Sequence, residues 1–351
     1  MLNSSFLFGQ LKAFQNFNPK IEYSVYGGKI LAHREDMNHI VSEPYYGQEL
    51  RIGHQTTGDN YWEGIYNYPT YGFGLYSGYF NNSIIGSPFA IFPYIDVPFF
   101  RKESFSVNWS LGCGVVFNLN EYDSISNPEN FAIGTDVNAY IDMSFSLRYK
   151  ISSQFELGAG VKAQHFSNGA MRHPNLGLNI VNGQITASYL LGDKQLFTKN
   201  EIKPVYKDYE FVGMYAFGIR GKSAEEPDTK YLNHTLSLAF NKRVTQKRTL
   251  EVGADIFYNE YIIEDFDQEE NVTNQQLMSY SVFAGSSLII NKFRWVVQLG
   301  YYVHRWVEYS KPVYERVALR YYITPNIFAN ASIKAHYAKA QCFEWGIGFT
   351  F

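Results

Sequence analysis

Apolar and polar side chains alternate along most of this chain, in segments long enough to cross a bilayer as β-strands. Every second side chain of residues 137–149 is apolar, and the positions between them include Asp142 and Arg148. Residues 105–117, 295–303 and 317–323 repeat the pattern. Because successive side chains of a strand point to opposite faces, each segment has one apolar and one polar face. The pattern predicts an all-β chain.

Strands of this kind occur in soluble β-sandwiches and in transmembrane barrels. Recurrent segments of about 10 to 15 residues suit strands that cross a bilayer at a tilt. Residues 1–351 contain no run near the roughly 18 apolar residues that a spanning helix needs. Since an open sheet edge cannot exist in lipid, the strands must close on themselves. We therefore predict an antiparallel transmembrane β-barrel of about 14 strands, within a range of about 12 to 16.

The last strand indicates which membrane this is. Aromatic and apolar residues alternate with Glu344, Gly346, Gly348 and Thr350, and the chain ends on Phe351. This ending resembles the C-terminal signature of bacterial outer-membrane barrels. We expect residues 1–20 to be an N-terminal periplasmic segment and residues 21–351 to form a single barrel in the bacterial outer membrane.

Two segments fit this barrel poorly. Residues 84–100 contain Pro88, Pro93 and Pro98, which cannot donate to a strand ladder, so we expect part of this segment to be a loop or an inward insert. Residues 192–208 are too long for a tight periplasmic turn. The charges expected inside the barrel can line a pore or form a packed salt-bridge plug, and the plug is favoured: Asp142, Arg148, Glu156, Arg294, Arg316 and Arg320.

Short and long connections alternate along the chain. Residues 151–153, 245–248, 291–292 and 324–326 read as tight turns, whereas 119–135, 168–178, 222–230 and 263–275 read as longer loops. Outer-membrane barrels keep short turns in the periplasm and long loops outside, so loop 168–178 is predicted to be extracellular. A strand over 155–167 rises about 30 Å, slightly more than the apolar band of about 25 Å. Ser167 is therefore expected at the outer-leaflet boundary.

A histidine and a serine lie two residues apart at the end of that strand. His165 and Ser167 fall on the face that carries Val161 and Ala163, and Asn179 falls on the apolar face of the next strand. A serine hydroxyl becomes a useful nucleophile when a base takes its proton, and the base works best when a third group fixes its tautomer. These residues are candidates for nucleophile (Ser167), base (His165) and orienting group (Asn179), all facing lipid.

The loop between these strands can supply the rest of an ester-hydrolysing site. Backbone N–H groups of Asn168, Gly169 and Ala170, with the side-chain amide of Asn175, are candidates for an oxyanion hole. Arg172 and His173 can meet a lipid phosphate, although a loop cation beside a membrane is more often simply solvated.

The sequence His165-x-Ser167-Asn168, followed by Pro174-Asn175-x-Gly177, resembles the PagL-type lipid A 3-O-deacylases, or acyloxyacyl hydrolases. The resemblance implies a barrel with a His–Ser–Glu triad on its lipid-facing surface, in which Asn175 is the oxyanion asparagine. The family's Glu falls on Asn179, which is a departure. These enzymes are eight-stranded barrels, so roughly 150 to 200 residues of this chain have no counterpart in the resemblance.

A second resemblance is to outer-membrane phospholipase A, which uses His-x-Ser-Asn-Gly with an asparagine at the offset of Asn179. Both resemblances imply hydrolysis of a lipid acyl ester, with lipid A favoured because the site faces the outer leaflet. Two alternatives stay open: an outer-membrane phospholipase A, or an inactive barrel that serves as a channel or as a scaffold subunit.

The expected partner is an outer-leaflet lipid, either lipid A or a phospholipid; protein partners are not indicated. A net charge of −3 and a pI near 6.3 argue against nucleic acid. Cys113 and Cys342 fall on opposite faces, so no disulfide is predicted. No cofactor is implied by the site. The acidic loop with Asp265, Asp267, Glu269 and Glu270 has ligands suited to Ca²⁺, but such a run is more often a solvated loop.

Overall fold

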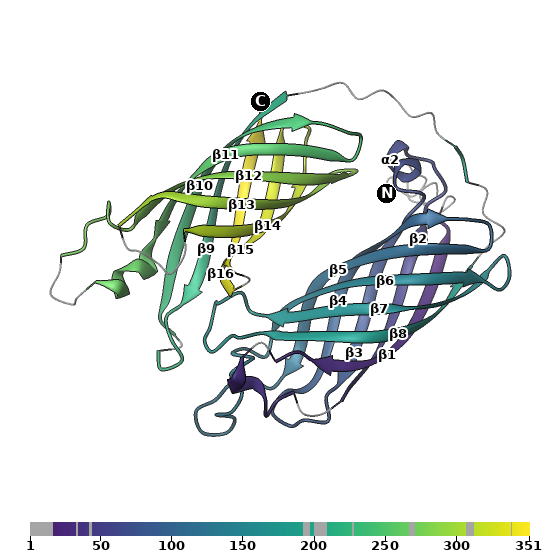
Figure 1. Cartoon of the computed structure of the whole chain (residues 1–351), viewed down its shortest axis with the longest axis horizontal. Helices are drawn as coiled ribbons and strands as arrows, with labels where there is room; N and C mark the ends of the chain where they lie inside the picture. Colours follow the sequence, from purple (N-terminus) through teal and green to yellow (C-terminus); the bar gives the residue numbers. More distant parts are fainter. Residues whose placement is uncertain are drawn as a thin grey trace, which may run out of the picture. The chain divides into compact units, whose positions relative to one another are not determined.

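The chain folds into two closed antiparallel barrels of eight strands each (Figure 1). This computed structural model describes residues 17–32, 34–41, 44–191, 197–199, 209–226, 228–266, 271–306, 312–337 and 339–351. The all-β prediction is confirmed. The sixteen strands found in these residues lie at the upper end of the predicted range.

The strands of the first barrel are β1 (Pro19–Ile30), β2 (Tyr45–Gln55), β3 (Thr70–Tyr79), β4 (Gly86–Arg101), β5 (Phe105–Leu119), β6 (Asn138–Lys150), β7 (Phe155–Ser167) and β8 (Leu178–Leu190). Those of the second are β9 (Tyr209–Gly221), β10 (Lys230–Arg243), β11 (Arg248–Asn259), β12 (Met278–Ile290), β13 (Phe293–Arg305), β14 (Val313–Tyr322), β15 (Ile327–His336) and β16 (Lys339–Thr350). Pairing of β1 with β8 and of β9 with β16 closes each barrel. Each consecutive pair of strands within a barrel is also hydrogen-bonded.

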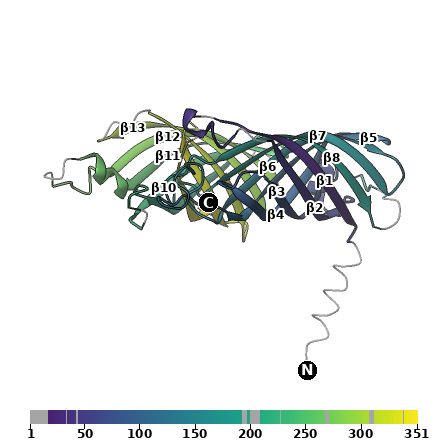
Figure 2. The same ribbon diagram turned by 90° about the horizontal axis from the view of Figure 1, so that it is seen from below.

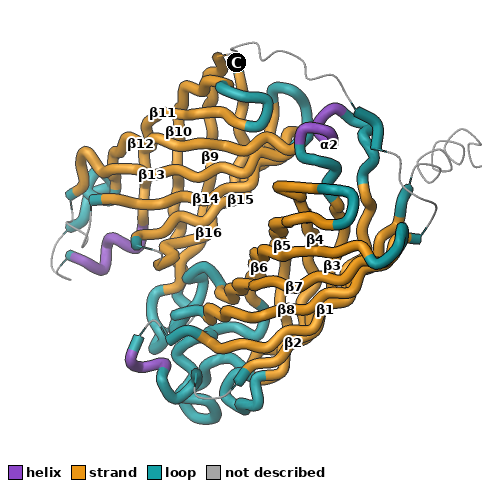
Figure 3. The backbone as a smooth tube through the Cα atoms, turned by 45° about the vertical axis from the view of Figure 1, so that its right-hand side comes forward, coloured by secondary structure: helices purple, strands orange, loops and turns teal. Residues whose placement is uncertain are grey.

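In the described part of the chain, three short helices lie in the connections: the 3-10 helix η1 (Glu35–Met37), the α-helix α2 (Tyr61–Ile65) and the 3-10 helix η2 (Glu260–Asp265). Figure 3 shows α2 among the loops of the first barrel, with strands in orange and loops and turns in teal. None of the described helices is long and apolar enough to span a bilayer.

The single barrel predicted over residues 21–351 is wrong, because the strands close after β8 and again after β16. Alternation has the same period in one large barrel and in two small ones, so it does not show where a sheet closes. The long connection 192–208 is the link between the barrels, and of it the structure describes only 197–199.

By its contacts the chain divides into two compact units. The first comprises Met1–Ser167 and Gly177–Glu201, and the second comprises Asn168–Leu176 and Ile202–Phe351. The nine-residue segment after Ser167 is therefore described below with the second unit. Figure 2 shows the strands of both units from a second direction.

The side chains on the two faces of each barrel wall are distributed as a bilayer requires. Along β6, Leu147 is 61% exposed on the outside, whereas its neighbour Arg148 is 5% exposed on the inside. Apolar side chains thus face outward and polar ones inward, the reverse of a soluble domain. Cys113 is an exposed free thiol and Cys342 a buried one, in line with the prediction of no disulfide.

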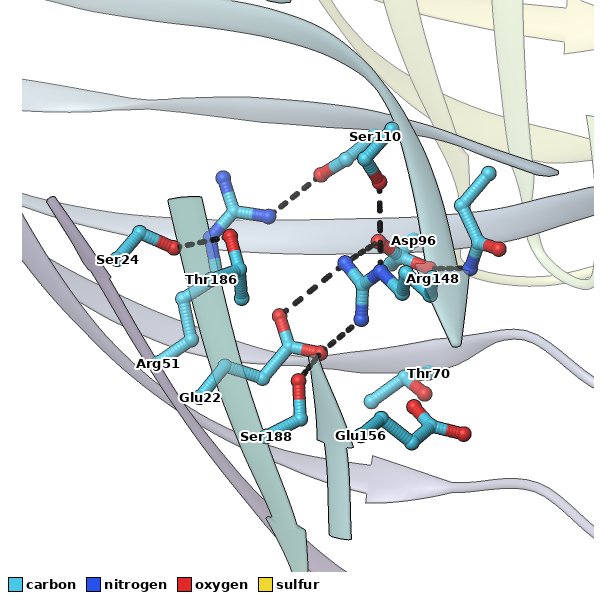
Figure 4. A network of polar contacts seen from close by, with 12 residues as sticks. Glu22, Ser24, Arg51, Thr70, Asp96, Ser110, Arg148, Glu156, Thr186 and Ser188 are labelled. Carbon is cyan, nitrogen blue, oxygen red and sulfur yellow. Dashed lines mark hydrogen bonds and ion pairs between the residues drawn. The ribbon is translucent and has the colours of Figure 1, made fainter. Parts of the chain in front are cut away.

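Ion pairs fill the interior of the first barrel (Figure 4). The Arg148 guanidinium contacts the carboxylates of Glu22 and Asp96, and Lys20 contacts Glu156 at 2.8 Å. Further along, Arg51 lies 3.2 Å from Asp142 and donates to Ser110 Oγ at 2.6 Å. Since a charge buried without a partner is costly, these groups stabilise one another.

The second barrel is built in the same way. Arg316 is fully buried and reaches both Asp255 and Glu344 at 2.8 Å. Arg320 pairs with Glu251 at 3.0 Å, and Arg294 with Glu210 at 2.6 Å. All six predicted inward charges are thus paired in a packed interior, as the plug interpretation expects.

The loop or insert expected within residues 84–100 is wrong, because β4 runs through the whole segment. Pro88 and Pro93 lie at gaps in its ladder with β5, whereas Pro98 pairs with Asn108 directly before a register shift. Pairing skips from Gly86 to Phe89 around Pro88, from Ile91 to Tyr94 around Pro93, and shifts again just after Pro98. Bulges and skipped pairs accommodate residues that cannot donate a hydrogen bond.

The predicted tight turns and longer loops are found, but the β2–β3 connection, residues 56–69, is long at the end that otherwise has the short turns. β6 and β7 are joined by residues 151–154 and β12 and β13 by 291–292, whereas 120–137 join β5 to β6. We assign the end with the short turns to the periplasm. Most of the acidic loop, 267–270, and most of the N-terminal segment, 1–16, lie outside the described residues.

The interior pairing predicts that Arg148→Ala strongly destabilises the first barrel. Removing the guanidinium leaves Asp96 buried without its ion-pair partner and Glu22 with Lys20 alone, at a cost of about 3–5 kcal/mol in the free energy of unfolding. Urea unfolding in lipid vesicles, followed by tryptophan fluorescence, measures this change. Arg248→Ala, exposed at the start of β11, should leave the unfolding curve unchanged. Equal stability of both variants would contradict the packed-interior account.

Candidate active site

The β7–β8 hairpin sets His165 directly opposite Asn179. The two residues are cross-strand partners in the ladder, and His165 Nδ1 lies 2.7 Å from Asn179 Oδ1. Both occupy outward-facing positions of their strands, because Ala163 and Val181, two residues away on the respective strands, are exposed. Residue spacing alone therefore places the imidazole and the amide in contact on the outer wall.

This contact fixes the tautomer of the histidine. A carbonyl oxygen only accepts hydrogen bonds, so the proton of a neutral imidazole must be on Nδ1 to make the contact. The other ring nitrogen, Nε2, then carries a lone pair. That is the form in which a histidine can take a proton from a hydroxyl.

Ser167 follows His165 on the same outward phase, but it is only 3% exposed. Gly177 packs over both: a Cβ built on it would lie 2.9 Å from His165 Cε1 and 3.4 Å from Ser167 Cβ. Its φ of +75° also favours glycine. The sequence motif contains Gly177, but only the structure shows this covering role.

Outer loop 120–137 holds Gly177 in place. The Gly177 N–H donates to Ala132 O at 2.9 Å, and Ala132 is fully buried. The Asn130 side chain braces this part of the loop, since its Oδ1 accepts from the N–H groups of Ala132 and Ile133. Sequence analysis missed this support because nothing in the loop sequence connects it with residues 165–179.

Segment Asn168–Leu176, in the second unit, holds the predicted oxyanion donors. The Asn168 N–H donates to Asn175 Oδ1 at 3.0 Å, so this N–H is already used. The same bond leaves the NH₂ group of Asn175 as the donor of that side chain. Among the described residues, the Ala170 N–H has no acceptor, and Ala170 adopts a φ of +66° that non-glycine residues rarely adopt.

Arg172 and His173 lie in the same segment. The Arg172 carbonyl accepts from Asn168 Nδ2 at 2.9 Å. Burial lowers the pKa of His173 to about 4, and the charges of Arg220, Lys339 and Lys230 within the second unit lower it as well. His173 is therefore neutral at pH 7, and Arg172 is the cation of the predicted pair.

Among the described residues, no group of three or more His, Cys, Asp or Glu side chains is arranged to hold a metal ion. The arrangement on β7 and β8 is suited to acyl transfer by side chains, because an imidazole in contact with an amide lies two residues from a hydroxyl on the same strand phase.

Comparison with protein families identifies the family of this chain. Residues 47–187, nearly all of the first barrel, match the family model of lipid A 3-O-deacylase (PagL). Residues 208–351, the second barrel, match the model of the acyloxyacyl hydrolase C-terminal domain. Together the two matches span most of the chain, and the chain belongs to the PagL family. It is a lipid acyl hydrolase of the bacterial outer membrane.

No curated protein matches the chain. Among solved structures, the KdgM porin in complex with disordered oligogalacturonate is 8% identical, with 95% of this chain and 99% of that one covered and a TM-score of 0.20. Omp33, an outer membrane protein of Acinetobacter baumannii, is 7% identical, with 96% and 100% covered and a TM-score of 0.19. Such low TM-scores carry no argument about this chain.

The cover over the site predicts that Gly177→Ala inactivates the protein without unfolding it. The new methyl group would meet His165 Cε1 and the Phe166 carbonyl, at a φ unfavourable for alanine. Displacing a catalytic base by a fraction of an ångström to an ångström costs on the order of 100-fold in rate.

Gly183→Ala is the matched control. Gly183 lies on β8, the strand that Gly177 immediately precedes, and no atom stands within 4 Å of the position that its Cβ would take. Ester hydrolysis by both purified variants, with thermal unfolding in detergent, measures the effect. Equal activity of Gly177→Ala and Gly183→Ala would show that the Gly177 contact is unimportant.

Proposed function

We propose that this protein is a serine esterase that removes an acyl chain from lipid A, with Ser167, His165 and Asn179 as its triad. The observation that carries the proposal is the 2.7 Å contact between His165 Nδ1 and Asn179 Oδ1, two residues from a serine on the outward phase of the same strand.

In the proposed reaction, His165 Nε2 takes the proton of Ser167 Oγ as that oxygen attacks the ester carbonyl. The resulting oxyanion accepts hydrogen bonds from the Asn175 NH₂ group and from backbone N–H groups, among which Ala170 is the best available. The imidazolium then gives its proton to the leaving alcohol of the glycolipid. Water, activated by the same histidine, releases the fatty acid and restores the serine.

Asn179 orients the imidazole but, being neutral, cannot offset the charge that His165 acquires. A carboxylate at this position, as in the family pattern, would do both. We therefore propose a working triad in which the imidazolium is stabilised less than it would be by a carboxylate.

Lipid A is the favoured substrate for two reasons. The family match is to a lipid A 3-O-deacylase, and the site lies at the end of β7 that we assign to the extracellular side. Lipid A occupies the outer leaflet there. The acyl ester then reaches Ser167 from the membrane and not from water.

Removal of either reacting group should abolish fatty-acid release. Ser167→Ala and His165→Ala are expected to lower turnover of purified lipid A by about 1,000-fold or more, because nucleophile and base act as a unit. Ser124→Ala, in an exposed loop, is the control for the serine. His234→Ala is the control for the histidine, because His234 also bonds a neighbour, Tyr215, on the wall of the other barrel.

Release of fatty acid from phospholipid but not from lipid A, lost in the same variants, would contradict the substrate and leave the triad intact. Unchanged activity of folded Ser167→Ala would contradict the mechanism.

Two substitutions separate orientation from charge at Asn179. Asn179→Ala should slow turnover roughly 10- to 100-fold, because it removes one hydrogen bond to a group that becomes charged. Asn179→Asp should retain at least wild-type turnover. Its acid limb in the pH–rate profile should move to higher pH, since an adjacent carboxylate favours the protonated imidazole, which cannot act as the base. Identical profiles for wild type and Asn179→Asp would show that Asn179 does not support His165.

A further inference from the structure

A cavity of about 590 Å³ opens at the periplasmic end of the first barrel, far along the strands from Ser167. Its wall combines the end of β4 (Arg101), the β4–β5 turn (Lys102 to Ser104), the end of β6 (Lys150) and Phe197. We call it the periplasmic pocket. A smaller hollow that also borders Arg101, Lys102 and Lys150 adjoins the interior ion pairs.

The wall of the periplasmic pocket is a built structure. Phe197 stacks on Tyr68 with ring centroids 4.5 Å apart, and the Tyr68 hydroxyl donates to Thr198 O at 3.0 Å. The Thr198 N–H in turn donates to Thr57 O at 2.7 Å. The segment 197–199 is thereby fastened to the β2–β3 connection.

Positive charge dominates the described residues that line this pocket: Arg101, Lys102 and Lys150 stand against Glu103 alone. The Arg101 guanidinium contacts neutral groups, namely the Tyr68 carbonyl at 3.1 Å and the Phe197 ring at 4.9 Å. Its Nε atom is buried and has no hydrogen-bond partner in the described part of the chain.

The cations of the neighbouring barrel interior are paired differently from those of the periplasmic pocket. Lys20 and Arg148, one layer deeper, are each held by carboxylates. No carboxylate of the described residues forms an ion pair with Arg101 or Lys102. Because a partly buried cation without an ion-pair partner is costly, Arg101 makes the pocket suited to an anion.

The surroundings indicate where that anion comes from. Lys102 Nζ lies 5.5 Å from the centroid of Phe100 and 6.0 Å from that of Phe105, and both rings are exposed. Tyr149, just before Lys150, is 57% exposed. Exposed aromatic rings beside lysines at the end of a barrel strand mark the level of lipid headgroups. Basic pockets at this level bind lipid phosphates.

We propose that the periplasmic pocket binds the phosphate group of an inner-leaflet phospholipid. Arg101, Lys102 and Lys150 supply the charge, and the hydroxyls of Ser104 and Ser152 lie in the same lining. The site is separate from the proposed esterase site, which is at the other end of β7.

Native mass spectrometry of the full-length protein in detergent tests this site, with phosphatidylglycerol, a diacylglycerol of the same chains and inorganic phosphate as probes. Wild type should retain phosphatidylglycerol at least about tenfold better than diacylglycerol. Lys102→Gln/Lys150→Gln should lose about tenfold in phosphatidylglycerol binding, as expected when two cations beside an anionic headgroup are neutralised. Arg101→Gln should show a loss of the same sign.

Lys247→Gln/Lys292→Gln is the matched control, because both lysines are exposed in periplasmic turns of the second barrel. An equal loss in this control, or equal retention of diacylglycerol, would overturn the site. Inorganic phosphate binding as tightly as phosphatidylglycerol would overturn the lipid assignment in favour of a soluble anion. Unchanged thermal unfolding of all variants in detergent shows that they are folded, and this readout does not depend on the triad.

Discussion

The need to satisfy every backbone hydrogen bond in lipid determines this structure. A strand with a free edge cannot persist in the bilayer, so each set of strands must close, and here closure occurs twice, at β1–β8 and at β9–β16. Closure puts half of the side chains inside a narrow barrel. An eight-stranded barrel leaves just enough room for side chains, so charges inside it must pair with one another. Arg148 and Arg316 do so, each bridging two carboxylates.

The outer wall follows from the same constraint. Once the interior is filled, a site that acts on membrane lipid has to lie outside, where apolar residues prevail and polar groups are tolerated mainly near the ends of strands. His165 and Asn179 occupy such a place. Their cross-strand pairing makes the contact a property of the barrel ladder, and Gly177, held by the Ala132 carbonyl, adds the cover.

Much of this could be predicted from the sequence because it is local. Alternation indicated the two faces, and the turn signals indicated which connections near the site are short and which are long. The spacing of His165 and Asn179 predicted their shared face. What failed depends on distant parts of the chain. One barrel and two barrels have the same alternation, and the prolines of β4 read as breaks because skipped pairs with β5 are invisible in one strand. Gly177 could not be understood before its φ and its neighbours were known.

Both barrels have filled interiors, and the proposed histidine–serine–asparagine triad lies on the first of them. The central claim is that Ser167 attacks an acyl ester of lipid A, and mass spectrometry of lipid A from bacteria that produce wild type or Ser167→Ala tests it most directly. The account predicts loss of one acyl chain from lipid A only when Ser167 is present. Lipid A of identical mass in both strains, with both proteins correctly inserted in the outer membrane, would contradict it.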